Sequence, residues 1–140
     1  MRDPQAVIRA LFDRVAVKDL AGASTLFAPD AVFIDAADPV VLEGRPAIKQ
    51  MIAEMWAGLP DVRVDVIAMV GDVSTVMTEI ELIGTHLGLY LGCPPTGATI
   101  RWRGASRYEI DPASGEIVHE SFFYDPAGLL AQLRPDPRAD

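Results

Sequence analysis

Two carboxyl side chains stand beside apolar residues in this sequence, and such groups can transfer protons. Asp35 ends the run "AVFID" at 31–35, and Glu120 lies within "EIVHESFFY" at 116–124. A carboxyl group in an apolar pocket has a raised pKa and can act as a general acid or base. Each residue also has a purely structural interpretation. Asp35 would begin the turn "DAADP", and Glu120 would be solvated at the mouth of a pocket.

Alternation along the run 116–124 indicates which residues accompany Glu120. Successive side chains of a strand point to opposite faces. Glu120, Phe122 and Tyr124 therefore share one face, while His119 and its odd-numbered neighbours share the other. A buried glutamate that faces aromatic rings favours its protonated form.

The segment "GTHLGLYLGCPPTG" at 84–97 places one of the two histidines among glycines, just before a double proline. We interpret it both as a loop between two strands and as the lip of a pocket. His86 would there shuttle a proton or orient a substrate oxygen. Cys93 is the only cysteine, so no internal disulfide is possible, and we interpret it as an inert thiol.

Motifs for other kinds of chemistry are not recognisable. His86 and His119 alone make a poor metal-ligand set, and no phosphate-binding loop or nucleophile elbow occurs. We therefore expect neither a metal nor a cofactor.

Composition narrows the class of protein. The 140 residues are 50% hydrophobic and 23% charged, which predicts one globular domain over 1–134 and a frayed tail at 135–140. The net charge of −8 argues against nucleic acid or an anionic membrane as a partner. No leader is recognised, and no apolar run approaches the ~20 residues of a membrane span. A cytoplasmic protein is expected.

Periodicity and turn residues predict the elements that would position these groups. Helices are expected over 3–18, 19–29 and 43–60, the second stopped by Pro29, with a closing helix over 125–133. A short strand is expected over 31–36. Longer strands are expected over 62–70, 74–86, 98–110 and 116–124, the first two joined at Gly71-Asp72. Helices segregated from an antiparallel sheet indicate an α+β fold.

Four segments together resemble the SnoaL-like polyketide cyclases. They are "LFAPDAVFIDA" at 26–36, "GRPAIKQMI" at 44–52, "GTHLGLYLGCPPTG" at 84–97 and "GEIVHESFFYDPAGLLAQL" at 115–133. These cyclases belong to the cone-shaped superfamily of nuclear transport factor 2, ketosteroid isomerases and limonene epoxide hydrolases. The resemblance implies three N-terminal helices packed on a curved antiparallel sheet, a deep apolar pocket at the open end, and a homodimer through the outer sheet face.

The resemblance also bears on individual residues. Asp35 matches the general base of the ketosteroid isomerases, but Leu11 and Ser106 stand where those enzymes have their oxyanion-stabilising tyrosine and aspartic acid. Losing such donors typically costs ~100- to 1000-fold in rate, so a steroid isomerase is not expected. Many SnoaL-like proteins carry "HWD" on the last strand. Here Glu120 takes the histidine position, and Phe122 takes that of the catalytic aspartate.

Glu79 and Glu81 allow two interpretations. Simple alternation puts them on the outer face, where they would pair with Arg103 and Arg107 on the neighbouring strand. The resemblance instead suggests that both glutamates face the cavity. We favour the ion pairs.

The expected function is a cofactor-free acid/base enzyme acting on an apolar polycyclic or terpenoid-like small molecule, by cyclisation, isomerisation, dehydration or epoxide opening. The alternative is a non-catalytic small-molecule binding or dimerisation module on the same fold. Chemistry is favoured if Asp35 and Glu120 reach one ligand. Three residues are the expected catalytic groups: Asp35, Glu120 and His86. Seven are expected to bind substrate: Phe12, Trp56, Trp102, Ser106, Tyr108, Phe122 and Tyr124.

Overall fold

The computed structural model describes residues 3–37 and 40–135. Its helices are α1 (Pro4–Ala16), α2 (Leu20–Ser24), α3 (Arg45–Gly58) and α4 (Pro126–Leu133). Its strands are β1 (Phe27–Asp35), β2 (Val40–Glu43), β3 (Arg63–Gly71), β4 (Thr75–Thr85), β5 (Thr99–Ile110) and β6 (Ile117–Tyr124). The α+β class is confirmed. The predicted frayed tail lies outside the described residues from position 136 onward.

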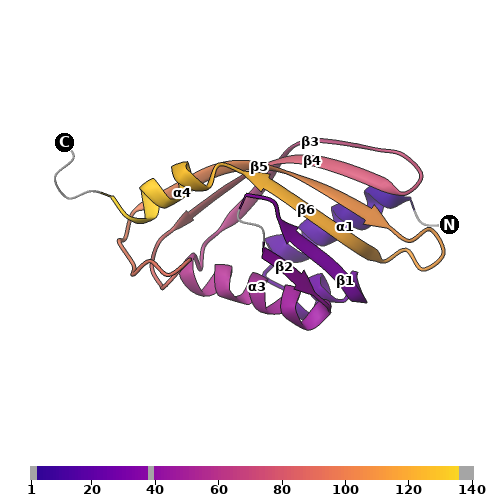
Figure 1. Cartoon of the computed structure of the whole chain (residues 1–140), viewed down its shortest axis with the longest axis horizontal. Helices are drawn as coiled ribbons and strands as arrows, with labels where there is room; N and C mark the ends of the chain where they lie inside the picture. Colours follow the sequence, from indigo (N-terminus) through magenta and orange to yellow (C-terminus); the bar gives the residue numbers. More distant parts are fainter. Residues whose placement is uncertain (1–2, 38–39, 136–140) are drawn as a thin grey trace.

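The six strands form one curved sheet in the order β2-β1-β6-β5-β4-β3. The sheet arches over α1 and α3, and α4 lies at one end beside β5 (Figure 1). It is mixed rather than wholly antiparallel, because β1 pairs in parallel with β6 while the other neighbours are antiparallel. Strand β6 therefore joins the N-terminal β1–β2 pair to the β3–β4–β5 meander.

Helix α1 forms as its sequence predicts. The Asp3 side chain accepts a hydrogen bond from the Gln5 N–H at 3.0 Å, and Pro4 occupies the first helical position, where its missing N–H costs nothing. The apolar residues of the helix are buried at helical spacing: Val7, Ile8, Leu11 and Val15.

The predicted second helix is wrong in its end point. Helix α2 stops at Ser24, and Pro29 lies inside β1 rather than terminating a helix. The pairing of β1 with β6 shifts register between Phe27 and Val32, and a residue without an N–H is tolerated at such an irregularity. The guanidinium of Arg45 supports this stretch, because its Nε and Nη2 both donate to the Phe27 carbonyl, at 2.9 and 2.7 Å.

Strand β2 was not predicted from the sequence. It pairs with the end of β1, from Glu43 opposite Val32 to Val40 opposite Asp35. Its four residues are exposed or half-buried, so they give no alternating signal.

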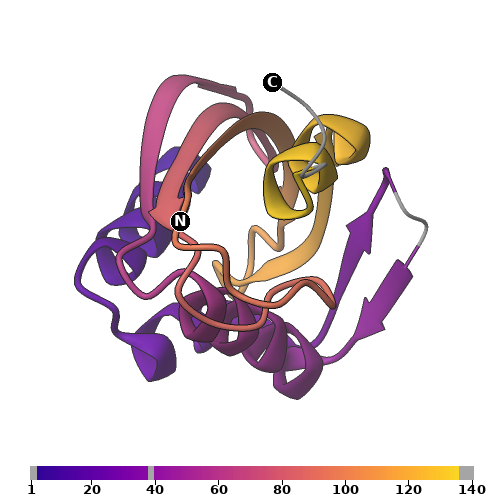
Figure 2. The ribbon, with the colours of Figure 1, turned by 90° about the vertical axis from the view of Figure 1, so that its left-hand side faces the viewer.

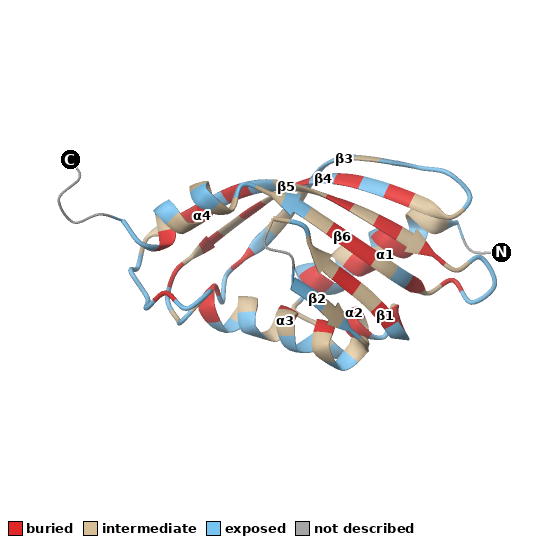
Figure 3. Ribbon diagram, viewed as in Figure 1, coloured by how far each residue is buried: buried red, intermediate tan, exposed pale blue. Residues whose placement is uncertain are grey.

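Burial alternates along the strands that cover the helices (Figure 3). In β4, Val76, Thr78, Ile80 and Leu82 are buried and point inward, while Met77 and Glu79 are exposed between them. The inner face of the sheet packs on α1 and α3, and the core lies between these layers.

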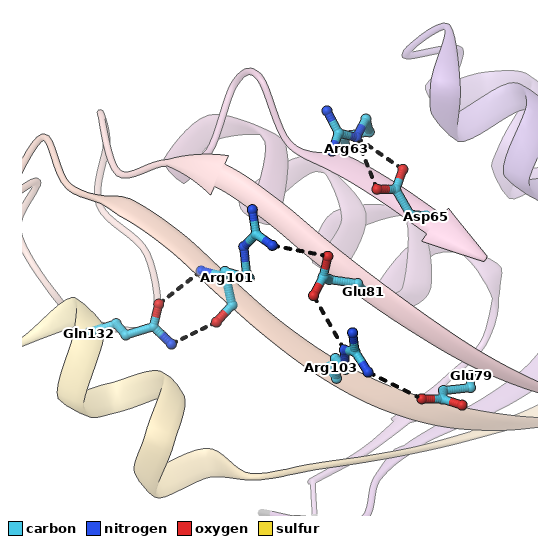
Figure 4. Close-up of polar contacts among 7 residues, drawn as sticks. All are labelled: Arg63, Asp65, Glu79, Glu81, Arg101, Arg103 and Gln132. Atoms are coloured by element: carbon cyan, nitrogen blue, oxygen red, sulfur yellow. Dashed lines mark hydrogen bonds and ion pairs between the residues drawn. The ribbon is translucent and has the colours of Figure 1, made fainter. Parts of the chain in front are cut away.

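The outer face carries the ion pairs that alternation predicted (Figure 4). Glu81 pairs with Arg101 at 3.5 Å and with Arg103 at 3.3 Å, and Arg103 reaches Glu79 at 3.8 Å. The expected outward orientation of both glutamates is confirmed. Arg107 differs from the expectation, because it pairs with Glu109 on its own strand at 2.7 Å.

None of the helices in the described residues is long and apolar enough to cross a membrane.

Candidate functional site

A cavity of about 490 Å³ lies between the inner face of the sheet and helices α1 and α3. Helix α4 and the loop after β4 lie at the end of the molecule seen in Figure 2, and both contribute to the cavity wall through Leu129 and residues 89–92. Apolar side chains from both layers make up most of the lining, including Leu11, Phe33, Met51, Ile80, Leu82 and Leu129. The volume is typical of sites that hold small molecules.

Glu120 projects from β6 into this cavity and is only 9% exposed. Its neighbour across the β5–β6 pair is Tyr108, and the Ser106 hydroxyl donates to Glu120 Oε2 at 3.0 Å. Burial raises the pKa of Glu120 to about 7, against smaller lowering effects of hydrogen bonds from Ser106 and Tyr108. A carboxyl group of this kind exchanges its proton near neutral pH.

Tyr108 lies beside Glu120 and is 2% exposed. Burial, with the nearby Glu120 charge, raises the pKa of Tyr108 well above its usual value. The phenol therefore stays neutral and keeps its proton as a hydrogen-bond donor at working pH.

Asp35 lies at the end of β1 and lines both the cavity and an adjoining depression. Its Oδ2 accepts a hydrogen bond from the Tyr124 hydroxyl at 2.9 Å, and its Oδ1 accepts one from the Ala37 N–H at 3.1 Å. The backbone contact matches the turn interpretation of Asp35, and the same side chain also faces the cavity. The rest of the predicted turn, at 38–39, lies outside the described residues.

The parallel pairing of β1 and β6 brings the two carboxyl groups to one cavity. Phe33 pairs with Glu120 and Asp35 pairs with Phe122, so the two acids lie on neighbouring strands, two residues apart along the strand direction. That offset is about 7 Å along the strand axis. Both side chains line the cavity, as an acid/base site requires.

Aromatic rings form much of the remaining wall. The rings of Phe122 and Tyr124 stack at 5.1 Å, and Tyr90 lies 6.4 Å from Trp102 in a tilted arrangement. Five residues expected from the sequence to bind substrate are in the lining: Phe12, Trp102, Tyr108, Phe122 and Tyr124.

Trp56 and Ser106 are placed differently from the expectation. Trp56 packs in the core, with the Lys18 ammonium 5.2 Å from its ring centroid, and is not part of the cavity lining. Ser106 is fully buried behind Glu120 and acts on the cavity through its hydrogen bond to that residue.

His86 lies outside the cavity lining and is fully buried. Its Nδ1 is 3.1 Å from Thr96 Oγ1, and its Nε2 is 3.2 Å from the Cys93 carbonyl. The loop is further held by the N–H groups of Leu87 and Gly88, which both donate to the Gly58 carbonyl at the end of α3. The imidazole therefore braces the pocket lip, and its position offers no contact with a ligand in the cavity.

Two lining residues that carry polar groups, Tyr90 and Glu54, were not identified from the sequence. Tyr90 belongs to the loop after β4, and burial with the nearby Asp35 charge raises its pKa to about 12. Glu54 comes from the exposed side of α3. The aromatic residue in an otherwise aliphatic glycine-rich loop was the available signal for Tyr90, whereas Glu54 resembles any solvated helix residue.

The described residues contain no group of three or more His, Cys, Asp or Glu side chains placed to hold a metal ion. Cys93 is buried in the loop that His86 braces.

Comparison with known proteins gives a consistent result. The family model of the SnoaL-like polyketide cyclases matches residues 5–133. A search of curated proteins gave no match.

Solved structures share the fold across almost the whole chain. A protein from Jannaschia sp. CCS1, provisionally described as a SnoaL-like polyketide cyclase, is 19% identical, with a TM-score of 0.86 over 96% of this chain and 93% of that chain. IdmH from Streptomyces antibioticus, provisionally described as a polyketide cyclase, is 27% identical, with a TM-score of 0.77 over 94% and 99%. AclR from Streptomyces galilaeus, provisionally described as a hydroxylase, is 20% identical, with a TM-score of 0.82 over 98% and 84%.

Proposed function

The chain belongs to the SnoaL-like polyketide cyclase family, and on that premise we propose that it is a cofactor-free acid/base enzyme acting on an apolar polycyclic or terpenoid-like carbonyl compound. The observation that carries the proposal is Glu120, a carboxyl group buried in an apolar cavity with a pKa raised to about 7. A general acid or base is most effective when its pKa lies near the working pH.

Glu120 is the proposed proton-transfer group. In its ionised form it would remove a proton from carbon next to the ligand's carbonyl group, and in its protonated form it would return that proton at another atom. Ser106 holds the carboxyl group through Oε2, and Tyr108 also donates a hydrogen bond to this group. Removal and return of one proton is the chemistry shared by cyclisation, isomerisation and dehydration.

Asp35 is the proposed second acid/base group, at the outer part of the cavity. The Tyr124 hydroxyl and the Ala37 N–H fix its orientation. Asp35 lies two residues along the strand from the level of Glu120, so the two carboxyl groups would reach different atoms of one ligand. An apolar ligand seated against the aromatic rings would displace water from both groups, which strengthens their interactions with it.

A non-catalytic binding module is the second candidate, and one observation favours it. Phe122 stands where the family's cyclases carry their catalytic aspartate, and its ring lines the cavity instead. The cavity would then hold a ligand without changing it.

We also infer a homodimer through the outer sheet face. Three apolar side chains on that face are well exposed: Val70 (65%), Met77 (44%) and Phe123 (51%). Apolar exposure grouped on one face is typical of a surface that a partner covers.

A hydrogen-exchange experiment tests the enzymatic proposal without knowledge of the product. Thermal shift against steroids, polyketide mimics and terpene epoxides first selects ketone ligands. The selected ketone is then incubated with the protein in D₂O, and deuterium incorporation next to the carbonyl is followed by mass spectrometry. We expect exchange with wild type and a loss of about 100- to 10,000-fold in Glu120→Gln, with ligand affinity retained.

Glu79→Gln is the matched control, because it removes one carboxylate from the outer face, away from the cavity. This variant should exchange the ligand's protons for deuterium at the wild-type rate. Tight binding without exchange in the wild type would replace the enzymatic proposal by the binding module, and exchange undiminished in Glu120→Gln would remove Glu120 from its role.

A further inference from the structure

The charged side chains in the described cavity lining are all acidic. They are Asp35, Glu54 and Glu120, supplied by β1, α3 and β6, and the lining includes no lysine, arginine or histidine. Arg134 is the basic residue of the adjoining depression, which it shares with Asp35 and Glu54. A negatively charged ligand would have to place its charge in an apolar space against carboxyl groups, which is costly. A positively charged ligand would instead be attracted by these carboxyl groups.

Aromatic rings accompany the outer carboxyl group. The Tyr124 hydroxyl donates a hydrogen bond to Asp35 at 2.9 Å, and the Tyr124 ring stacks on that of Phe122. The Asp35 carboxylate therefore lies next to a stacked pair of aromatic rings. Tyr90 is in the same lining, and burial together with the nearby charge of Asp35 raises its pKa, so its side chain remains a neutral phenol. The electron-rich faces of neutral aromatic rings attract ammonium groups, and this arrangement is the usual one for recognising them.

We propose that the ligand of this cavity is an organic cation: a hydrophobic carbonyl compound that carries a protonated or quaternary amine, seated between Asp35 and the rings of Tyr124 and Tyr90. Its apolar body extends along the aromatic wall toward Glu120. This inference rests on the proposed function in taking the cavity as the ligand site and the carbonyl compound as its occupant, and it adds the charge of that occupant.

A set of three non-reactive probes tests the charge preference by isothermal titration calorimetry. The probes are benzyltrimethylammonium, its uncharged carbon isostere neopentylbenzene, and benzylsulfonate. The cation should bind about tenfold or more tightly than the isostere, and benzylsulfonate should not bind measurably. The cation's advantage should shrink as salt is raised. An isostere that binds as tightly as the cation, or an anion that binds better through Arg134, would overturn the inference.

Variants locate the preference. Asp35→Asn should remove most of the advantage of the cation over the isostere and leave the affinity for the isostere unchanged. Glu54→Gln, at an exposed position where folding is not at stake, should reduce the advantage about two- to threefold. Glu79→Gln removes the same amount of charge from the outer face and should leave the cation's advantage intact. An equal loss in Glu79→Gln would mean that net protein charge, and not the cavity, attracts the cation.

The readout is binding of inert probes, so it separates this inference from the enzymatic proposal. A cation preference without any proton exchange would leave the inference standing and remove the enzyme. Proton exchange that depends on Glu120, without a preference for the cation, would support the enzymatic proposal and remove this inference.

Discussion

Two opposing effects act on the pKa of Glu120, because burial in an apolar cavity disfavours its charged form while hydrogen bonds from Ser106 and Tyr108 favour it. Burial is the larger effect and raises its pKa from the ordinary 4.5 to about 7. The folded chain therefore binds a proton at this site, between those two pH values, that the unfolded chain has released. The residue proposed for proton transfer therefore makes the fold less stable as pH rises.

The pH dependence of unfolding checks this directly. Because the folded-state pKa is raised, the free energy of unfolding of the wild type should fall relative to Glu120→Gln as pH rises from about 4.5 to 7, and then level off. A shift of this size corresponds to about 3 kcal/mol. Urea denaturation of both proteins at several pH values measures the difference. A constant difference across this range would show that Glu120 titrates at its ordinary value.

The dependence of the proton-exchange rate on pH should report the pKa of the same group, Glu120. If ionised Glu120 removes the proton, the exchange rate at fixed ketone concentration should rise with pH and level off above about 7. A profile that levels off near pH 4.5 would assign the base role to a carboxyl group with an ordinary pKa.

At the scale of elements, strand β5 makes room for the cavity wall at Gly104. A methyl group added there would lie 2.5 Å from two atoms of the Phe122 ring and 2.8 Å from the Phe123 carbonyl. The missing side chain on β5 is thus what lets the Phe122 ring lie across the neighbouring strand. Gly104→Ala should destabilise the fold by about 1–3 kcal/mol and weaken ligand binding, because the ring must move.

Gly97→Ala provides a comparison for Gly104→Ala. It lies in the loop before β5 and has open space around it, although its φ of +75° also strains an alanine. It should lose some stability with ligand affinity preserved. Equal effects of both variants on binding would show that the Phe122 ring is not positioned by the space at Gly104.

Arg45 fastens the start of α3 to the irregular part of β1. Its two hydrogen bonds to the Phe27 carbonyl are joined by an ion pair with Glu116 at 3.4 Å. Arg45→Met should lower the free energy of unfolding by about 2 kcal/mol, because a charged donor to a buried stretch is lost. Glu116→Gln removes the ion pair alone and should cost under about 1 kcal/mol in the same urea titration. Equal losses would assign the effect to the ion pair.

Much of the fold follows from the sequence because its signals are local. The cap at Asp3, the helical spacing in α1 and the alternation in β4 and β6 each depend on neighbours within a few residues. The length of α2 and the presence of strand β2 depend instead on residues that are distant in the sequence. Pro29 reads as a helix stop until its place in the β1 irregularity is known, and β2 is held by its pairing with β1.

The site was predictable to the extent that alternation determines it. The alternation of side chains along β6 correctly predicted that Phe122 and Tyr124 share the face of Glu120. The side of a helix that meets a cavity is set by packing angles, so the apolar stripe of α3 could not show that Met51 lines the cavity while Trp56 packs elsewhere. His86 was assigned by its place in a loop, and only the fold shows that its ring faces Thr96 and Cys93.

For the whole molecule, the outer face of the sheet is the part that a second copy would cover. Phe123→Asp puts a charge on that face without touching the cavity, since Phe123 points away from it. We expect the dimer measured by sedimentation velocity to become a monomer with unchanged secondary structure. Met77→Asp, elsewhere on the same face, should have a similar effect. A wild-type chain that is monomeric at all concentrations would contradict the proposed dimer.

Strand β6 is the last strand in the described part of the chain and pairs with both β1 and β5 in the middle of the sheet. A ribosome therefore releases β1–β2 and the β3–β5 meander as two unjoined pieces, each with a bare edge that β6 will later fill. Such edges invite pairing with other chains. Synthesis that halts before residue 117 leaves both edges bare, so such truncated products should aggregate, whereas a chain that includes β6 joins the two pieces into one sheet.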